Sequence, residues 1–463
     1  MNTNLRFKYI LGILSLCAVL SCKLKNSASQ VTAEKEKISK PNKNGNPLVY
    51  DVGMADPHIK IYNDKAYLYA TRDEDKTSHK FVMPDWKIWS SDDLINWTLE
   101  TTIDPTETYM GVSKNCWAPD VAAKNGKYYF YFSNGNKDTG VMVGETPTGK
   151  FKDALGEPLL PQDMTIVKEY DPSVIIDDDG EAYIIFGHHR SDHPDFYYMI
   201  AKLNEDMISL AESPKEVLIT GDVEVLGGND KPNLHKRNGI YYLSAGSHYA
   251  IAKNIYGPYV KTGNSGNENY GLTDRAHGNY FSWNNQDFHT WCHFHLGKEV
   301  ARYRESYISY LHYKDNGEMV TDTDFLDAHF SMGVGQYDAN WDRIQAEWYM
   351  KSENIEKKEN QNGGFEIQTA NSKGALFFPN VYNIENKNVI EFYVTSDRGG
   401  VIEIYNKDAD GKLLGTCKFS DTQNNYKMVS CKIENTEGVK DVFIQLQPKK
   451  EGFLNLDWFV FKK

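Results

Sequence analysis

The amino-acid sequence predicts an all-β protein that consists of a five-bladed β-propeller followed by a β-sandwich of the jelly-roll type. Short aromatic-rich runs alternate with turn residues, and one pattern recurs five times at intervals of roughly fifty to sixty residues, which is typical of propeller blades. After Gly335 the sequence pattern changes to short runs of alternating apolar and polar residues, at the spacing typical of a β-sandwich. We therefore expect the propeller at residues 46–335 and the sandwich at 336–463.

Each repeat begins with an acidic or histidine residue, and an aromatic-rich strand follows roughly seven to ten residues later. The five strands begin at Lys65, Lys127, Glu181, Ile240 and Asp287. The five leading residues are Asp56, Asp120, Asp171, Asp230 and His277. The innermost strand of each propeller blade lines the central channel. We therefore expect these five side chains to converge at one mouth of the channel.

The first segment has the features of a bacterial export signal. Arg6 and Lys8 precede an apolar run that is too short to span a bilayer comfortably. The run ends in Leu20-Ser21-Cys22, which resembles a lipobox, so residues 1–22 are predicted to be a lipoprotein signal peptide with lipidation at Cys22. This predicts a protein anchored to the bacterial cell envelope; an ordinary secretory signal and a secreted protein are the alternative. Residues 23–45 are polar and predict a flexible tether.

The net charge and the cysteine pattern exclude some classes of binding partner. The net charge of −13 argues against nucleic acid, because phosphate binding needs a basic field. No CxxC pattern occurs, so zinc is not expected. Cys417 and Cys431 lie on two β-like runs and are either bonded or two free thiols. We expect a monomer that meets a membrane only through its lipid anchor.

The repeated carboxylates have a chemical interpretation. Glycoside hydrolysis needs one protonated carboxyl group to release the leaving group and one ionised carboxylate to activate water or attack carbon. A third acid raises the pKa of the proton donor by like-charge repulsion. Tyrosine and tryptophan supply stacking surface for sugars, and Trp86 and Trp117 are candidates. Trp117 is favoured because it adjoins Pro119-Asp120.

Four segments resemble the blade motifs of glycoside hydrolase family 43, a five-bladed propeller family. They are Ala55-Asp56-Pro57-His58, Trp117-Ala118-Pro119-Asp120-Val121, Tyr170-Asp171-Pro172-Ser173-Val174 and His277-Gly278-Asn279-Tyr280-Phe281. The resemblance implies inverting chemistry, with Asp56 as the general base and Asp171 as the residue that tunes and positions the acid. Asp120 is then a structural support or a substrate contact. His277 matches a histidine near the channel, where some members hold calcium or a water cluster.

The general acid is where the sequence departs from that family. The usual Glu-Gly-Pro or Glu-Ala-Pro is replaced by Asp230-Lys231-Pro232. Aspartate is one methylene shorter, and a misplacement of about one ångström can cost on the order of 100-fold in rate. We rank Asp230 first as the acid; Glu224, six residues upstream, is the first substitute and His235 a weaker one.

The second domain resembles a family 6 carbohydrate-binding module. The segments that carry the likeness are Arg343-Ile344-Gln345-Ala346-Glu347, Asp410-Gly411-Lys412-Leu413-Leu414-Gly415 and Asn455-Leu456-Asp457-Trp458-Phe459. The resemblance implies a structural calcium ion shared by Glu347 and Asp457, which offer hard oxygen ligands. It also implies sugar contacts by Tyr426 and Asn455. A domain that only stiffens the propeller is the alternative.

Together these features predict an inverting glycoside hydrolase acting on a plant or algal polysaccharide or its oligosaccharides. The resemblance favours β-xylosidase or α-L-arabinofuranosidase activity, with galactan as a further candidate substrate. No cofactor is required for this chemistry. The alternative is a non-catalytic glycan-binding propeller that has lost the usual acid, which the Asp230-Lys231 pair motivates.

Overall fold

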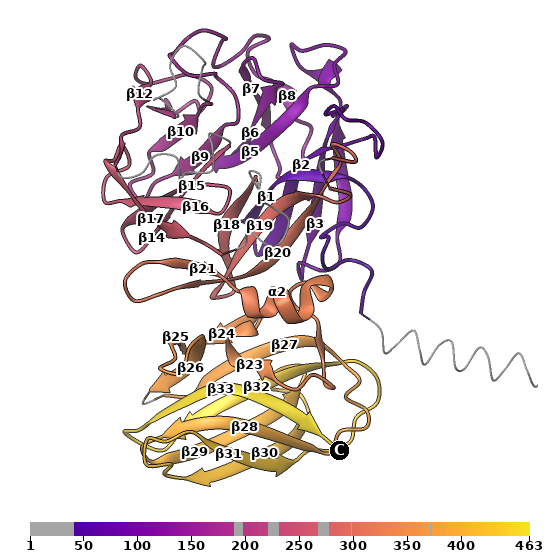
Figure 1. The fold of residues 1–463 in the computed structure, drawn as a ribbon, viewed down its shortest axis with the longest axis vertical. Coiled ribbons are helices and arrows are strands. Elements are labelled where there is room, and N and C mark those ends of the chain that lie inside the picture. Colours follow the sequence, from indigo (N-terminus) through magenta and orange to yellow (C-terminus); the bar gives the residue numbers. More distant parts are fainter. Residues whose placement is uncertain (1–40, 189–197, 221–230, 267–276, 298, 371) are drawn as a thin grey trace, which may run out of the picture. The chain divides into compact units, whose positions relative to one another are not determined.

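The computed structural model describes residues 41–188, 198–220, 231–266, 277–297, 299–370 and 372–463. Residues 41–463 form one compact unit, built almost entirely from β-strands (Figure 1). The described residues contain one α-helix, α2 (Thr323–His329), and the 3-10 turns η1 (Pro105–Glu107), η4 (Phe330–Met332) and η5 (Ala346–Trp348). In this part of the chain, no helix is long and apolar enough to cross a membrane.

Five antiparallel sheets follow one another along the first part of the chain, one for each predicted blade. The first blade is β1 (Met54–Tyr62), β2 (Lys65–Arg72), β3 (Trp86–Ser91) and β4 (Thr98–Ile103). The second is β5 (Cys116–Lys124), β6 (Lys127–Asn134), β7 (Thr139–Gly144) and β8 (Lys152–Asp153). The third is β9 (Ser173–Ile176), β10 (Ala182–Phe186), β11 (Met199–Lys202) and β12 (Lys215–Glu216). The fourth is β14 (Pro232–Arg237), β15 (Ile240–Ala245), β16 (His248–Ala252) and β17 (Tyr259–Asn264), with β13 (Ile219–Thr220) added in parallel. The fifth is β18 (Gly278–Trp283), β19 (Gln286–Phe294), β20 (Arg304–Tyr313) and β21 (Met319–Thr321).

The innermost strands close a ring. Strand β1 contacts β5, β5 contacts β9, β9 contacts β14, β14 contacts β18, and β18 returns to β1. The segment before β1 secures this closure, because the Asn46 side chain exchanges two hydrogen bonds with the Ile308 backbone and the Leu48 N–H donates to Ser306 O at 2.7 Å. The first blade is thereby tied to β20 of the last, which confirms the predicted five-bladed propeller.

The hairpins inside the blades follow from their turn residues. Asn125-Gly126 joins β5 to β6 and Asn238-Gly239 joins β14 to β15, each as a two-residue loop. All four residues have positive φ, between 49° and 76°. This is the type I′ geometry whose twist matches the paired strands, and Asn-Gly adopts it at little cost.

The C-terminal residues form two sheets that face each other as a sandwich, as predicted. One sheet contains β22 (Tyr337–Asp338), β24 (Lys351–Glu353), β27 (Gly374–Tyr382), β32 (Lys440–Pro448), β29 (Gly399–Asn406) and β30 (Leu413–Ser420). The other contains β23 (Ile344–Gln345), β25 (Glu356–Glu359), β26 (Phe365–Ala370), β33 (Phe453–Lys462), β28 (Val389–Ser396) and β31 (Lys427–Lys432). Cys417 on β30 and Cys431 on β31 are free thiols that interact with each other across the two sheets.

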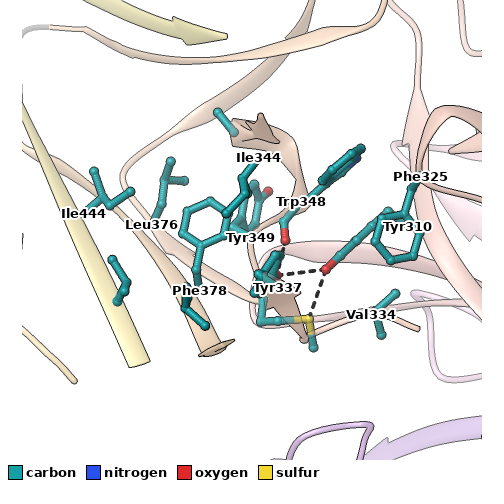
Figure 2. Packing of buried hydrophobic residues seen from close by; sticks show 14 of the residues in the cluster. Tyr310, Phe325, Val334, Tyr337, Ile344, Trp348, Tyr349, Leu376, Phe378 and Ile444 are labelled. Atoms are coloured by element: carbon teal, nitrogen blue, oxygen red, sulfur yellow. Dashed lines mark hydrogen bonds between the residues drawn. The ribbon is translucent and has the colours of Figure 1, made fainter. Parts of the chain in front are cut away.

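One hydrophobic core runs from the last blade into the sandwich. Figure 2 shows Tyr310 of β20 and Phe325 of α2 packed with Tyr337 and Trp348. The Tyr310 and Tyr337 hydroxyls hydrogen-bond at 2.9 Å, and the Trp348 indole N–H donates to Asp322 at 2.6 Å. Because these buried polar groups find partners across the junction, the two domains share packing rather than only a linker.

Candidate active site

A pocket of ≈ 750 Å³ opens where the innermost strands of the propeller begin. Among the described residues, its lining comes from the first, second, third and fifth blades and includes Asp56, Trp117, Asp171, His277 and Arg304. Three of the five residues that lead the sequence repeats, Asp56, Asp171 and His277, therefore meet in one cavity. The repeat predicted that all five would converge there. Asp120 does not line the cavity, and Asp230 lies outside the described residues.

The backbone around Asp56 directs its carboxylate into the pocket. The pairing of β1 with β2 shifts register between Ala55 and His58, so the strand carries an irregularity at Asp56-Pro57. Asp56 has a φ of 52°, and Asp171 has a φ of 59°. Positive φ is uncommon for residues with a Cβ, though aspartate tolerates it better than most. Such backbone strain clusters at functional sites, and a β-bulge re-aims a side chain.

Cationic groups surround the Asp56 carboxylate. Its Oδ1 lies 2.6 Å from His277 Nδ1 and 2.7 Å from Arg304 Nη1, and the Cys292 thiol lies at 3.9 Å. Burial would raise the pKa of Asp56, but the charges of Arg304, His277 and Lys231 outweigh it and lower the pKa well below the usual range. Asp56 is therefore held ionised in a buried position, as a general base must be.

Arg304 is itself held by a second buried carboxylate, Asp73. Its Nε and Nη2 donate to the two Asp73 oxygens at 2.9 and 3.0 Å, and its backbone N–H donates to Asp73 at 2.8 Å. This two-pronged contact fixes the plane of the guanidinium group and leaves Nη1 directed at Asp56. Asp73 and Asp56 are each 1% exposed, so one guanidinium charge is shared between two buried carboxylates, and burial raises the pKa of Asp73.

Asp171 enters the pocket from the third blade, and a lysine approaches it from the fourth. The Asp171 backbone N–H donates to Ser133 Oγ at 2.9 Å, which joins the third blade to the second. The buried Lys231 ammonium donates to Pro172 O at 2.6 Å. Burial lowers the pKa of Lys231, while Asp120, Asp171 and Asp56 raise it through their charges. Lys231 thus places a positive charge among the acids of the channel.

Asp120 lies outside the pocket lining, and protein groups occupy both of its carboxylate oxygens. Oδ1 lies 2.8 Å from His58 Nδ1 and 2.8 Å from Lys60 Nζ, and Oδ2 accepts from the Val174 backbone N–H at 2.8 Å. The residue is fully buried. Asp120 therefore links the first, second and third blades, and this geometry fits a structural support rather than a sugar contact.

The two tryptophan candidates occupy different environments. Trp117 lines the pocket and makes edge contacts with Phe81 and Tyr170, each with ring centroids 5.9 Å apart. Trp86 does not line the pocket, because its ring is fully buried between the first and second blades and its indole N–H donates to Trp117 O at 2.8 Å. Trp86 supports the Trp117 backbone and presents no face to a sugar.

The two acid candidates, Asp230 and Glu224, lie outside the described residues. His235, a weaker substitute in the same region, packs against Tyr242 and Tyr280 with ring centroids 4.9 and 5.1 Å apart. Burial lowers its pKa to about 3, so its imidazole is neutral at neutral pH and is too weak an acid to protonate a leaving group.

In the sandwich, Tyr426 stacks on Tyr393, which in turn stacks on Trp458, with centroids 4.9 and 5.2 Å apart. These half-buried rings form an aromatic surface over β28 and β33. Asn455 is 8% exposed, and its amide accepts from Gln368 at 2.8 Å and donates to Glu366 at 2.6 Å. Protein partners thus engage both amide atoms of Asn455, and it supports this face rather than offering free hydrogen bonds to a sugar.

The carboxylates predicted to bind calcium come from segments that adjoin one another. Glu347 lies in η5, which contacts β26 and β33, and Asp457 lies in β33. Burial, with repulsion from Asp322 and Asp457, raises the pKa of Glu347 well above its usual value, and its Oε2 is buried without a hydrogen-bond partner. Burial raises the pKa of Asp457 to about 6. The oxygen donors suit a hard cation, although the described residues bring no three metal-binding side chains together.

Several residues in or beside the pocket were not identified from the sequence. Arg304 and Phe81 lie outside the five repeated strands. Asp73 and Cys292 lie within the repeated strands that begin at Lys65 and Asp287 but were not singled out, and Lys231 was considered only as a neighbour of the acid. Arg304 and Asp73 are separated by 231 residues, so their pairing leaves no local signal. An arginine at the start of the third strand of the last blade was the one available hint, because a buried arginine requires an anionic partner.

A propeller whose channel mouth gathers two buried carboxylates in an aromatic pocket defines the class of carbohydrate-cleaving propellers. The family comparison agrees with this class. Residues 45–319 match the model of glycosyl hydrolases family 43, and residues 345–463 match the family 6 carbohydrate-binding module. The chain belongs to glycoside hydrolase family 43 and is a glycosidase with a C-terminal module of family 6.

Relatives of known name span several substrates. The chain is 26% identical to an arabinoxylan arabinofuranohydrolase of Paenibacillus polymyxa, over 93% of this chain and 76% of that protein. It is 30% identical to a β-D-galactofuranosidase of Aspergillus niger, over 60% of this chain and 84% of that protein.

Two solved structures share the fold. An arabinoxylan arabinofuranohydrolase of Bacillus subtilis has a TM-score of 0.55 and 22% identity, covering 92% of this chain and 99% of that one. A β-xylosidase/α-arabinofuranosidase from a compost metagenome, solved with xylotriose, has a TM-score of 0.51 and 26% identity, and the match covers 61% of this chain and 98% of that one.

Proposed function

We propose that this family 43 glycosidase inverts the anomeric centre and releases arabinofuranose or xylose from a plant or algal polysaccharide or its oligosaccharides, with galactan as a further candidate. The observation that carries the proposal is Asp56, a buried carboxylate held ionised by Arg304 and His277 and directed into an aromatic pocket. The names of the relatives support the choice of sugar, since they act on arabinoxylan, xylosides and galactofuranosides.

Asp56 would remove a proton from the water that attacks the anomeric carbon. A carboxyl group from residues 221–230 would protonate the glycosidic oxygen as the bond breaks, with Asp230 first and Glu224 second. Asp171 would position this acid and raise its pKa by like-charge repulsion. Lys231 interacts with the same carboxylates, and its positive charge weakens the repulsion between Asp171 and the acid. An acid paired with Lys231 would stay ionised, so the acid must reach the glycosidic oxygen without forming that pair.

The test begins with aryl glycosides of L-arabinofuranose, D-xylose, D-galactose and D-galactofuranose. Proton NMR of the first product reports whether the anomeric centre is inverted. We expect turnover of at least one glycoside, inversion, and a loss on the order of 1,000-fold or more in Asp56→Asn, since general-base catalysis contributes about 10²–10⁴-fold. Absence of turnover on every glycoside, or equal rates for wild type and Asp56→Asn, would overturn the proposal.

The acid is identified by leaving-group dependence. A dinitrophenyl leaving group departs without protonation, whereas a sugar or methyl leaving group requires it. The variant that lacks the acid therefore keeps its rate on dinitrophenyl glycosides and loses it on oligosaccharides. We expect this pattern for Asp230→Asn and not for Glu224→Gln; the reverse result assigns the role to Glu224.

The anchor and the second domain complete the proposal. We propose that the mature protein is lipidated at Cys22 and displayed on the cell envelope, which palmitate labelling of wild type and Cys22→Ala tests.

The aromatic surface of Tyr426, Tyr393 and Trp458 supports glycan binding by the sandwich. Affinity electrophoresis of the full chain in arabinoxylan gels, with Trp458→Ala as the variant, tests that role.

A further inference from the structure

We propose that Cys417 and Cys431 form a redox-active pair, which an external disulfide oxidises to an intramolecular disulfide joining the two sheets of the sandwich. The inference concerns the sandwich and does not depend on the proposed glycosidase function. Both residues are free thiols in the structure, and their side chains interact with each other. The observation that carries the inference is the path of the two edge strands on which these cysteines lie.

The two strands form an arch between the sheets. Strand β30 lies at the edge of one sheet, β31 lies at the edge of the other, and residues 421–426 connect them. Within this connection Gln423 and Asn424 have positive φ values of 59° and 57°, which are typical of a tight turn. Cys417 and Cys431 lie at equal sequence distances before and after Asn424. The arch therefore brings the two cysteines opposite each other.

The backbones stay close on the far side of the cysteine pair. The Glu434 backbone N–H donates to Leu414 O at 2.8 Å, and these two residues keep the register of the two cysteines. Gly415 permits this approach, because a Cβ atom there would lie 2.6 Å from Lys432 O. The turn at one end and the hydrogen bond at the other hold the strands together on both sides of the pair. Because a disulfide requires closely spaced backbones, this bond needs little movement of either strand.

The environments of the two thiols differ and assign them separate roles. Cys417 is 1% exposed and belongs to the hydrophobic core, whereas Cys431 is half-buried at the border of that core. The hydrogen bond between the thiols lowers the pKa of Cys431 and, together with burial, raises the pKa of Cys417. The thiolate is the form of cysteine that attacks a disulfide. Cys431 is therefore the attacking thiol, and Cys417 resolves the intermediate.

The proposed oxidation is a thiol–disulfide exchange in two steps. The Cys431 thiolate attacks one sulfur of a small disulfide such as oxidised glutathione, which forms a mixed disulfide and releases one glutathione. Cys417 then loses its proton and attacks Cys431 Sγ, which forms the intramolecular disulfide and releases the second glutathione. The two protons and two electrons that leave the protein end on the two glutathione thiols.

Strand β31 is the element that the bond holds in place. It lies at the edge of its sheet, where its neighbour is β28. Tyr426 directly precedes β31 and stacks on Tyr393 of β28. The disulfide closes a loop of about fifteen residues, which removes conformational freedom from the unfolded chain. It therefore stabilises the sandwich and the strand next to its aromatic surface.

The experiment equilibrates the full chain with mixtures of reduced and oxidised glutathione and then alkylates the remaining free thiols under denaturing conditions. Trypsin places the two cysteines in residues 413–418 and 428–432, so mass spectrometry detects the disulfide as a cross-linked pair of peptides. We expect this pair in the oxidising mixtures, with Cys116 and Cys292 of the propeller still alkylated. If Cys417 and Cys431 remain alkylated throughout the glutathione series, the proposal is overturned.

Single variants test the roles of the two thiols. Cys417→Ala removes the resolving thiol, so we expect Cys431 to accumulate the mixed disulfide with glutathione. Cys431→Ala leaves only the buried thiol, and we expect a glutathione-modified fraction at least about tenfold smaller, because a buried thiol is inert. Equal fractions in the two variants overturn the assignment of Cys431 as the attacking thiol.

Thermal melts and amide hydrogen exchange measure the effect of the bond. We expect the oxidised wild type to melt about 5 °C or more above the reduced protein, with slower exchange in β31. The double variant Cys417→Ala with Cys431→Ala loses this difference. Cys116→Ala is the matched control, because it removes a buried thiol from the propeller and keeps the difference. If the disulfide forms while melting and exchange stay unchanged, the stabilising role is overturned.

Discussion

The contact between Arg304 and Asp56 provides the sharpest test of how the pocket is tuned. We consider Arg304→Gln, which keeps a planar polar side chain and removes the charge. Without the guanidinium charge, burial raises the pKa of Asp56, and the charges of His277 and Lys231 still oppose this rise. Because Asp56 must be ionised to act as the base, the acidic limb of the kcat/KM profile is expected to move to higher pH.

The size of this shift follows from the geometry. Nη1 and Oδ1 are 2.7 Å apart in the structure. Two unit charges whose centres are about 4 Å apart attract by about 4 kcal/mol at an effective dielectric constant of about 20, or about 3 pKa units. Arg304 divides its charge between Asp56 and Asp73, so we expect the limb to move by about 1 to 2 units.

The assay is kcat/KM against pH on whichever nitrophenyl glycoside the wild type hydrolyses. Arg302→Gln is the matched control, because Arg302 lines the same pocket without contacting Asp56, and it leaves the position of the limb unchanged. Breaking a buried ion pair costs about 3–5 kcal/mol. The double variant Arg304→Gln with Asp73→Asn removes the stranded charge, and it should recover stability while keeping the shifted limb. A limb that stays in place, or moves to lower pH, refutes the electrostatic reasoning.

Three further predictions concern stability. Burial raises the pKa of Glu305 to about 7; the folded state therefore binds the proton more tightly, and stability falls by about 3 kcal/mol as pH rises from about 4.5 to 7. Glu305→Gln should abolish this loss in thermal melts, whereas the exposed Glu299→Gln should retain it. Asp120→Asn weakens contacts that join three blades and should lower the free energy of unfolding by about 3–5 kcal/mol without changing the KM of the folded fraction; a normal melt would contradict that role. Calcium chloride, but not magnesium chloride, should raise the Tm of the wild type and not of Glu347→Gln; an unresponsive wild type would rule out the calcium site.

Much of the fold was predictable from local sequence patterns. The Asn-Gly dipeptides at 125–126 and 238–239 specify hairpins because they adopt positive φ cheaply, and the repeat places one aromatic strand in each blade. Asp56, Asp171 and His277 were located by the same repeat, since equivalent positions in a closed ring point to one axis. These are short-range regularities, and a single sequence displays them directly.

Contacts between residues far apart in the sequence could not be predicted from these local patterns. The sequence favoured Trp117 over Trp86 as a sugar contact, but it did not show that Trp86 is fully buried, because packing between blades decides which ring is covered. Asp120 occupies a repeat position, but His58 and Lys60 of the neighbouring blade draw its carboxylate away from the pocket. Partner choice of this kind depends on residues that only the closed ring brings together.

The sequence by itself determined the all-β architecture, the five-fold repeat and the convergence of Asp56, Asp171 and His277 on one end of the channel, because each depends on periodicity and turn chemistry. Only the tertiary structure decided the electrostatics and the shape of the site. Arg304 reaches Asp56 and Asp73 from more than two hundred residues away, and Phe294 meets Phe81 across the seam of the ring. Ring closure fixes both contacts, and no local pattern encodes it.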